Sequence, residues 1–394
     1  MKNIFLFLSF VFAITFSAKA QTAISITNGN WTNPLTWNCT CVPTNGYSVT
    51  IGNNVTLNTS LVFNTGGITI NNTGSLIQDA SLNRDIWING GYYNNGGTAN
   101  FRYFLVSAGS LSNSGSTTVT AITNSVSFAN TGALTMDSMY VSGNMTNAST
   151  GKIIGDSLTN GAGITLTNYG RILVSAITNS GTVNNNNYMG GSRYTNSGTF
   201  TNMDSVILTY SLWNRVKFTN SAGAKVRLTK NFHNYHPSKT AVFDNNGNVT
   251  VLDSWYNTDT VKGGASGYFQ VQDTSANSGI MKGNYTFCDL TPLTTNVDFN
   301  SGTIAGTLSF NCSVGIKENS AANLFSVYPN PNIGNFAVKG NSKEELLLSD
   351  ELGRIIYKVE LNESNNFTST ISGLQNGIYF LKGKDSINKI VVNK

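Results

Sequence analysis

The sequence predicts an all-β protein whose body is a right-handed parallel β-helix, a solenoid of stacked coils. A short pattern recurs through the body, in which an apolar residue, an Asn, a Gly and another apolar residue follow each other at every second position. Most successive Asn positions lie 17 to 25 residues apart, which is the length of a coil with three short strands. Charged residues are sparse between these copies, and glutamate is absent from residues 21–317. Apolar residues nevertheless recur throughout, so the composition does not indicate disorder.

The first twenty residues have the anatomy of a secretory signal peptide. Lys2 precedes an apolar run over residues 4–16, and Ala18-Lys19-Ala20 forms a small-residue cleavage site. A run of about 13 residues is shorter than the ~20 that a membrane-spanning helix needs. We therefore expect a mature chain that begins at Gln21 and contains no transmembrane segment.

The segment after the leader differs from the repeats and is expected to cap the solenoid. It contains Trp31 and Trp37, followed closely by Cys39 and Cys41. The first coil of a solenoid exposes one end of the core and needs a cover. Two indole rings and a local disulfide would supply it.

The repeat itself reads as a short strand, a turn and a second short strand. Asn and Gly both tolerate the positive φ that tight turns require, and the two apolar residues, six positions apart, point to one side if both arms are extended. Stacking buries these residues, and stacked Asn side chains can hydrogen-bond along the rod. The clearest copies centre on Asn72, Asn130, Asn168, Asn179, Asn196 and Asn245, with looser copies at Asn64, Asn94, Asn113, Asn147, Asn220 and Asn300. This spacing predicts about 12 to 14 coils; a sandwich of independent β-hairpins is the alternative.

A second element often follows each Asn by 7 to 9 residues, and it consists of Asp, Ser and an apolar residue. It occurs at Asp137, Asp156, Asp204 and Asp253. Aspartates on one face could hold Ca²⁺ between coils, because this cation prefers oxygen ligands. The interpretation that we favour is a local turn in which the side chain caps its own loop. No other cofactor is expected.

The body contains no recognisable catalytic arrangement. His233 and His236 lie three positions apart before Pro237, and no third metal ligand is apparent. Right-handed β-helices often cleave acidic polysaccharides, and Asn257-Thr258-Asp259 matches one element of the polygalacturonases. The Asp-Asp and Gly-His-Gly elements of those enzymes are missing. Glycoside hydrolysis usually needs two carboxylates across the bond, so a non-catalytic body is favoured while an enzyme stays open.

One segment of the body combines cations with aromatic residues. No acidic residue occurs between Asp204 and Asp244. Such a mixture suits acidic sugars or lipopolysaccharide, and Lys225 and Arg227 share the outward face of one strand. The alternative is an ordinary solvated surface. The candidate ligand-binding residues are Tyr210, Trp213, Arg215, Lys217, Lys225, Arg227, Lys230 and Tyr235.

The cysteines predict two disulfides in an oxidising compartment. Cys39 and Cys41 lie at one end of the predicted rod, and Cys288 and Cys312 lie at the other. A disulfide needs Cα atoms within about 7 Å, so pairing between the two ends is excluded. Cys288 should pair with Cys312, and Cys39 should pair with Cys41 or stay reduced. Zinc is disfavoured because Cys-x-Cys lacks the usual spacing.

The charge distribution divides the mature chain into two parts. Five of the six glutamates lie beyond residue 340, and the shift falls in a polar stretch that predicts a linker at 319–323. The expected parts are therefore a body over 21–318 and a tail over 324–394. The net charge of +5 falls to +3 once Lys2 and Lys19 are removed, which is too small to imply a nucleic-acid partner.

The tail resembles the type A C-terminal sorting domain of the type IX secretion system. The resemblance rests on Tyr328-Pro329-Asn330-Pro331, on Gly353 within Asp350–Arg354, on Gly377 and Tyr379, and on the closing run that ends at Lys394. The opening Trp-rich segment is similar to that of many secreted β-helix proteins in bacteria with this system. The resemblance implies an immunoglobulin-like β-sandwich, recognition by the translocon, and a secreted or outer-membrane-surface location. In that family the tail is typically removed and the passenger is anchored to surface polysaccharide or shed.

These observations together predict a secreted or cell-surface solenoid that is displayed, adheres or contacts glycans without catalysing a reaction. The alternative is an extracellular polysaccharide lyase or glycoside hydrolase of β-helix type.

Overall fold

A computed structural model describes residues 21–80, 83–238, 240–294, 296–312, 325–383 and 387–394. The signal peptide predicted at 1–20, the linker predicted at 319–323 and Lys239 lie outside the described residues. The chain divides into two compact units, one ending at Cys312 and the other beginning at Ser313.

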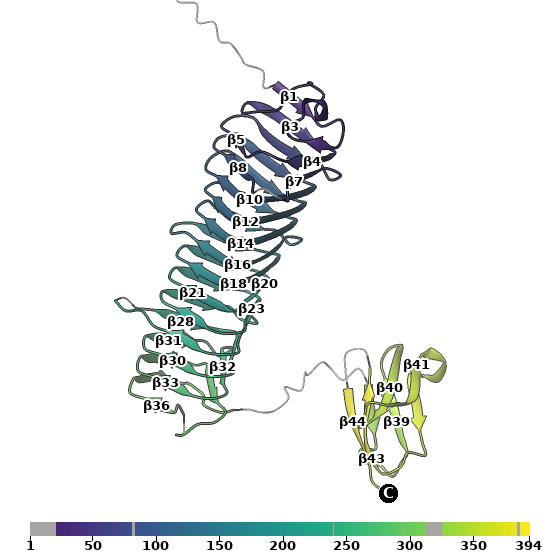
Figure 1. Ribbon diagram of the computed structural model, residues 1–394. Helices are drawn as coiled ribbons and strands as arrows, with labels where there is room; N and C mark the ends of the chain where they lie inside the picture. The colour runs from purple at the N-terminus through teal and green to yellow at the C-terminus, as the bar shows by residue number, and fades with distance from the viewer. Residues whose placement is uncertain (1–20, 81–82, 239, 295, 313–324, 384–386) are drawn as a thin grey trace, which may run out of the picture. The chain divides into compact units, whose positions relative to one another are not determined.

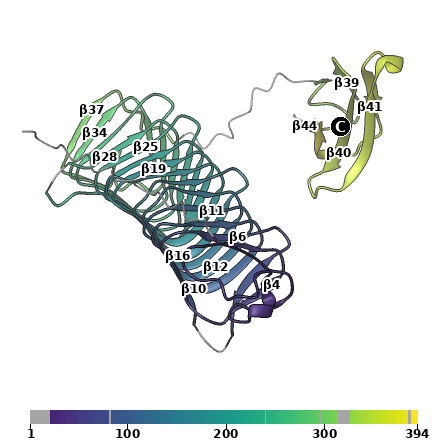
Figure 2. The ribbon, with the colours of Figure 1, turned by 90° about the horizontal axis from the view of Figure 1, so that it is seen from above.

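The first unit is a solenoid whose coils each contribute one strand to three parallel faces (Figures 1 and 2). Within the described residues, the first face contains fifteen strands. In order along the solenoid they are β1 (Gln21–Ile24), β3 (Tyr47–Ile51), β6 (Gly67–Ile70), β9 (Tyr92–Asn95), β11 (Ser110–Asn113), β13 (Phe128–Asn130), β15 (Met145–Asn147), β17 (Thr165–Asn168), β19 (Thr182–Asn185), β22 (Thr199–Asn202), β25 (Lys217–Asn220), β28 (Val242–Asn245), β31 (Thr260–Gly263), β34 (Ile280–Gly283) and β37 (Thr303–Gly306).

In the coils at both ends of the solenoid, the second and third faces are formed by separate strands. In the coils between them, one long strand per coil runs through both faces. The second face has β2 (Gly29–Asn30), β4 (Asn54–Leu57), β7 (Ser75–Gln78), β20 (Tyr188–Gly191), β23 (Ser205–Leu208), β26 (Lys225–Leu228), β29 (Asn248–Val251), β32 (Tyr268–Val271) and β35 (Thr286–Asp289). The third has β5 (Leu61–Phe63), β8 (Asp85–Ile88), β21 (Arg193–Asn196), β24 (Leu212–Asn214), β27 (Phe232–Asn234), β30 (Trp255–Asn257), β33 (Ser275–Asn277) and β36 (Phe299–Asn300). The shared strands are β10 (Thr98–Val106), β12 (Ser116–Asn124), β14 (Ala133–Val141), β16 (Lys152–Asn160) and β18 (Arg171–Asn179).

Strand pairing confirms the parallel solenoid and three strands per coil. Every strand pair of the first unit is parallel and joins one coil to the next, as in β22 with β25. Each pairing between long strands omits one central residue, such as Asp137 opposite Asp156, where the chain turns from the second face to the third. Hairpins would give antiparallel neighbours, so the alternative sandwich of hairpins is wrong for this unit.

The core forms because buried and outward residues alternate along each short strand. In β26, Val226 and Leu228 are buried while Lys225 and Arg227 are exposed. Residues at equivalent positions of successive coils then stack, as Phe200, Phe218 and Phe243 do with ring centroids 4.7 and 4.9 Å apart. Apolar burial of this kind is the main stabilising contribution to the coil stack.

The predicted asparagine ladder exists, but there are two of them. The first lies where the first face turns into the second, and side-chain amides bond from coil to coil through Asn95, Asn113, Asn130, Asn147, Asn168, Asn185, Asn202, Asn220 and Asn245. The second lies where the third face turns into the first, through Asn160, Asn179, Asn196, Asn214, Asn234, Asn257, Asn277 and Asn300. The expected Asn-x-Gly turn of each repeat unit therefore corresponds to two different corners of the coil. Asn72 belongs to neither ladder and is exposed, because Ile70 occupies the ladder position in its coil.

The second ladder begins abruptly at Asn160, and the reason is a valine. Val141 lies directly beside Asn160 in the preceding coil, and Asn124 lies one coil further back. The buried Oδ1 atom of Asn160 accordingly has no hydrogen-bond partner. An unpaired buried acceptor costs about 1–3 kcal/mol.

Replacing Val141 with Asn should extend this ladder and stabilise the protein by about 1 kcal/mol. The new amide would donate to Asn160 Oδ1, which offsets the loss of the buried valine methyl groups. The matched control is Val183→Asn, at a fully buried position outside both ladders, which should destabilise by about 3 kcal/mol. Urea unfolding of the secreted chain measures both. Equal destabilisation by the two substitutions would contradict the prediction.

The N-terminal end of the solenoid is capped as expected. Trp31 and Trp37 are buried, with ring centroids 5.0 Å apart in an edge-to-face arrangement. The Trp31 indole donates to the carbonyl of Pro43, and the Trp37 indole donates to that of Trp31. The short 3₁₀ helix η1 (Pro34–Thr36) joins the two rings.

Both expected disulfides are present in the solenoid. Cys39 pairs with Cys41 across a Cα–Cα distance of 5.1 Å, and Cys288 pairs with Cys312 across 4.8 Å. The second bond encloses the last coils and should stabilise them by about 3 kcal/mol through loop-closure entropy.

The second unit is a small β-sandwich of two antiparallel sheets, consistent with the predicted tail fold. One sheet has the order β38 (Phe325–Tyr328), β39 (Phe336–Gly340) and β42 (Thr368–Ile371). The other has the order β41 (Ile355–Leu361), β40 (Glu344–Asp350), β43 (Gly377–Lys382) and β44 (Ile387–Val392). The 3₁₀ helix η2 (Glu363–Asn365) follows β41. The unit has its own core, which includes Phe336, Val338, Leu346, Leu348 and Leu381.

Candidate functional site

Three aromatic side chains form a column on the outward side of the third face. The register of β24, β27 and β30 places Trp213, His233 and Tyr256 on adjacent coils. The Trp213 and His233 rings stack with centroids 3.8 Å apart, and those of His233 and Tyr256 stack at 5.1 Å. All three side chains are half-buried. The column is therefore a row of rings that reaches the surface.

The column ends at a small residue on each side. Thr195 precedes Trp213 in the register, and Ala276 follows Tyr256. A threonine cannot cover an indole, so Trp213 keeps one uncovered face towards β21. A surface hollow of about 320 Å³ opens beside Trp213. It is lined by Arg193 and Thr195 on the β21 side and by Asn231 and His233 on the β27 side.

The hollow beside Trp213 is rich in positive charge. Arg193 and Arg215 both line it, no acidic residue does, and neither arginine forms an ion pair within the described part of the chain. The Arg193 guanidinium lies 5.1 Å from the centre of the Tyr210 ring. This cation–π contact orients the arginine without neutralising its charge.

His233 is neutral at ordinary pH in this setting. Burial between two rings lowers the pKa of its imidazole, because burial penalises the charged form. The column thus offers uncharged ring faces beside two free arginines.

The structure brings together only part of the candidate set. Tyr210, Trp213 and Arg215 line the hollow. Lys217 lies on the first face in β25, whereas Lys225 and Arg227 lie on the second face in β26. Tyr235 follows β27 and is exposed. Lys230 lies at the corner before β27, where its Nζ is 2.8 Å from Asp253, and this contact raises the pKa of Lys230.

Sequence reasoning missed three members of the site. Arg193 and Tyr256 lie outside the acid-free segment, and the sequence suggests only a metal-ligand role for His233. The available signal was the coil period: residues about twenty positions apart become neighbours when coils stack. Aligning β21, β24, β27 and β30 by their terminal asparagines would have found the column.

His236 and two residues of the polygalacturonase-like tripeptide take part in hydrogen bonds between coils. The backbone N–H of His236 donates to Asp259 Oδ2, and Asn257 is a buried member of the second ladder. Across the residues that the structure describes, no group of three or more His, Cys, Asp or Glu side chains is placed to hold a metal ion.

The Asp-Ser elements do not line a single face. Asp137, Asp156 and Asp253 lie at corners between the second and third faces, whereas Asp204 lies at a corner between the first and second. In two of the elements the serine hydroxyl donates to its neighbouring aspartate, at Asp204–Ser205 and Asp253–Ser254. These contacts agree with the turn interpretation.

A buried carboxylate pair lies near the C-terminal end of the solenoid. Asp289 and Asp298 both bond to Ser275. Burial raises the pKa of Asp289. Their remaining oxygens accept backbone N–H groups of Thr291 and Leu293, so the pair organises the loop between β35 and β36.

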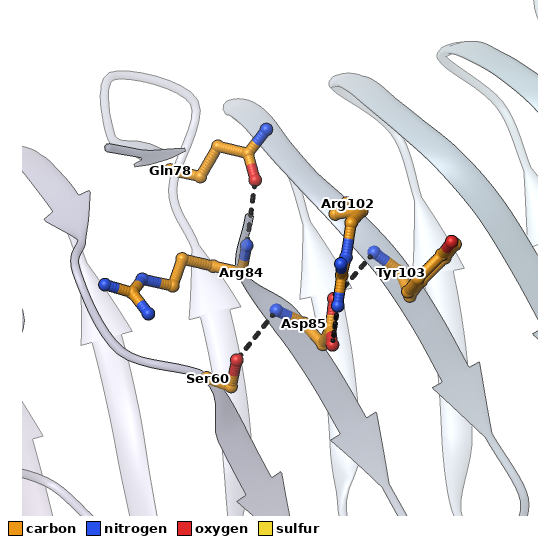
Figure 3. Close-up of polar contacts among 6 residues, drawn as sticks. All are labelled: Ser60, Gln78, Arg84, Asp85, Arg102 and Tyr103. Atoms are coloured by element: carbon orange, nitrogen blue, oxygen red, sulfur yellow. Dashed lines mark hydrogen bonds and ion pairs between the residues drawn. The ribbon is translucent and has the colours of Figure 1, made fainter. Parts of the chain in front are cut away.

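A bidentate ion pair links two coils near the N-terminal end of the third face (Figure 3). Arg102 donates Nε to Asp85 Oδ1 at 2.9 Å and Nη2 to Oδ2 at 2.7 Å. Its guanidinium also lies 4.3 Å from the centre of the Tyr103 ring. The Asp85 N–H donates to Ser60, and the Arg84 N–H donates to Gln78. The hydrogen bonds from Arg102 hold the pKa of Asp85 below its ordinary value.

This ion pair should make part of the stability depend on pH. A carboxylate with a lowered folded-state pKa stabilises the fold above its unfolded pKa, and that contribution is lost as the pH falls. The gap in urea midpoint between wild type and Asp85→Asn should thus be full above pH 5 and shrink below 3.8, the ordinary value for Asp85. Asp137→Asn, which removes an exposed aspartate, is the control. A gap that does not change between pH 2.5 and 7 would contradict this assignment.

The tail residues singled out in the sequence mostly hold the sandwich together. Asn330 donates to the carbonyl of Lys389 and accepts from the N–H of Val391, which ties the entry loop to β44. Gly353 has a φ of 78° in the turn between β40 and β41. The Tyr379 hydroxyl donates to the carbonyl of Gln375. Gly377 begins β43, and the N–H of Lys394 donates to Asn376. Tyr328, Pro329 and Pro331 are exposed.

Comparison with known families identifies the tail. The model of the secretion system C-terminal sorting domain matches residues 326–394. The chain therefore carries a type IX sorting domain, and the protein is exported through that system to be secreted or attached to the cell surface. No curated protein and no solved structure matches the chain significantly. Among the described residues, no helix is long and apolar enough to cross a membrane.

Proposed function

We propose that the exported solenoid is a non-catalytic surface module that contacts glycans through its third face. The observation that carries the proposal is the outward column of Trp213, His233 and Tyr256. Aromatic rings give a large contact area at low entropic cost, and their apolar faces suit sugar rings.

Other features of the third face support this proposal. Trp87 and Tyr103 are exposed on the same face near its N-terminal end. Between the two aromatic regions, Thr159, Thr178 and Thr195 occupy the central outward position of successive coils. A long polysaccharide chain could follow such a face and contact rings at both ends.

The second hypothesis is that the solenoid is a polysaccharide lyase or glycoside hydrolase of β-helix type. Hydrolysis needs an acid and a base or nucleophile on either side of the bond. At the corner next to the candidate column, Asp253 and Asp273 both interact with Lys230, whose Nζ is 2.8 Å from Asp253. We therefore favour binding.

Binding of the secreted chain to a glycan array should detect at least one polysaccharide class, and Trp213→Ala should weaken it at least tenfold. Removing the indole removes the stacking surface, worth about 1.5 kcal/mol or more. Tyr169→Ala is the matched control, because Tyr169 is equally exposed but lies at the corner between the first and second faces, away from the third face. Equal binding by all three proteins would contradict the proposed site, and release of shorter or unsaturated products would favour the enzyme.

A further inference from the structure

We propose that the hollow beside Trp213 binds one anionic sugar unit, whose ring stacks on the indole while its carboxylate or sulfate is held by Arg193 and Arg215. This inference rests on the proposed glycan contact and adds the charge and the position of the ligand.

The stacking part follows from the geometry of the column. One face of the Trp213 indole is covered by His233 at a centroid distance of 3.8 Å. The opposite face points along the solenoid towards Thr195, which is too small to fill the space of a ring one coil away. A flat sugar ring placed there would take the position that the column leaves empty. The hollow of about 320 Å³ is of a size that suits one sugar unit.

The charge part follows from the two arginines. Both side chains are exposed, both line the hollow, and neither has an ion-pair partner within the described residues. Tyr210 lies under the Arg193 guanidinium and limits its orientations. A guanidinium binds carboxylate and sulfate oxygens through paired N–H donors. Two unpaired arginines beside a ring face therefore favour an anionic over a neutral sugar.

The nearby acidic residues do not oppose this assignment. Asp253 and Asp273 lie at the corner between the second and third faces in the coils beyond the site. Both interact with Lys230, whose Nζ is 2.8 Å from Asp253. Lys225 and Arg227 add positive charge on the adjoining face without lining the hollow. They raise the local concentration of anionic chains rather than select them.

The test compares polysaccharides that share a backbone but differ in charge. The carboxylate arm uses pectate against its fully methyl-esterified form, and the sulfate arm uses dextran sulfate against dextran. We expect the secreted chain to bind at least one anionic member tenfold or more tightly than its partner. The double variant Arg193→Gln, Arg215→Gln should lose that preference, while Arg227→Gln should keep it.

The possible outcomes separate the two proposals. Binding of neutral and anionic partners with equal affinity, lost on Trp213→Ala, would overturn the charge inference and leave the glycan site standing. An anionic preference unchanged in the double arginine variant would also overturn the inference, because other residues would then bind the anionic group. Absence of glycan binding of any kind would reject both. Thermal unfolding of each variant checks that these exposed substitutions leave the fold intact.

Discussion

Deleting residues 313–394 will stop export at the periplasm, with loss of essentially all surface and extracellular protein. The sorting domain occupies residues 326–394, and the tail packs around its own core. Its removal leaves the solenoid core intact because the described members of that hydrophobic cluster lie between Ala23 and Phe310. Fractionation of the native host, with protease shaving of intact cells, measures where the truncated protein accumulates.

Two point variants test whether export requires the folded tail or only the presence of the C-terminal residues. Val338→Asp places a charge in the tail core, where Val338 is fully buried, and should block export as the deletion does. Lys358→Ala changes an exposed residue of β41 and should be exported normally. A reporter carrying residues 1–20 and 313–394 should reach the surface. Normal display of the truncated chain would show that the tail is not the export signal.

The solenoid could be predicted from the sequence because its determinants are periodic. A turn signal and flanking apolar residues recur at coil length, and each coil must bury the same kind of side chain against the next. The cap was predictable for a related reason, since Trp31 and Trp37 interrupt the period where the solenoid begins.

The two ladders could not be separated from the sequence. Asn168 and Asn179 share the same local Asn-x-Gly motif, yet they belong to different corners of the coil. Several ladder members, including Asn185 and Asn214, have no glycine two positions later. The motif reports local turn chemistry, whereas ladder membership depends on the position of the residue within the coil.

The candidate site was only partly predictable for the same physical reason. A linear segment of cations and aromatics winds around the rod, so its members face in three directions. Lys225 and Trp213 are twelve positions apart in sequence and lie on different faces. Trp213 and Tyr256 are 43 positions apart but are separated by one ring in the column.

Replacing Asn185, in the middle of the first asparagine ladder, is expected to lower the stability of the solenoid strongly. Its Oδ1 accepts from Asn168, and its Nδ2 donates to Asn202 and to the carbonyl of Ser205. The side chain is fully buried, so water cannot replace these partners. Removing one partner from a buried hydrogen bond costs about 1–3 kcal/mol for each group left unpaired.

Asn185→Ala should therefore destabilise the solenoid by about 3 kcal/mol or more, measured by urea unfolding, with faster hydrogen exchange in the coils on both sides. Asn185→Asp should cost at least as much at neutral pH, because a carboxylate keeps the acceptor but cannot donate to Asn202. Burial raises the pKa of the new carboxyl above its unfolded value, so this variant should regain stability as the pH falls and the group protonates. Asn184→Ala, the half-exposed neighbour in the same strand, should change stability by less than about 0.5 kcal/mol. If Asn184→Ala and Asn185→Ala proved equally mild, the ladder would contribute little, and apolar burial alone would hold the coils together.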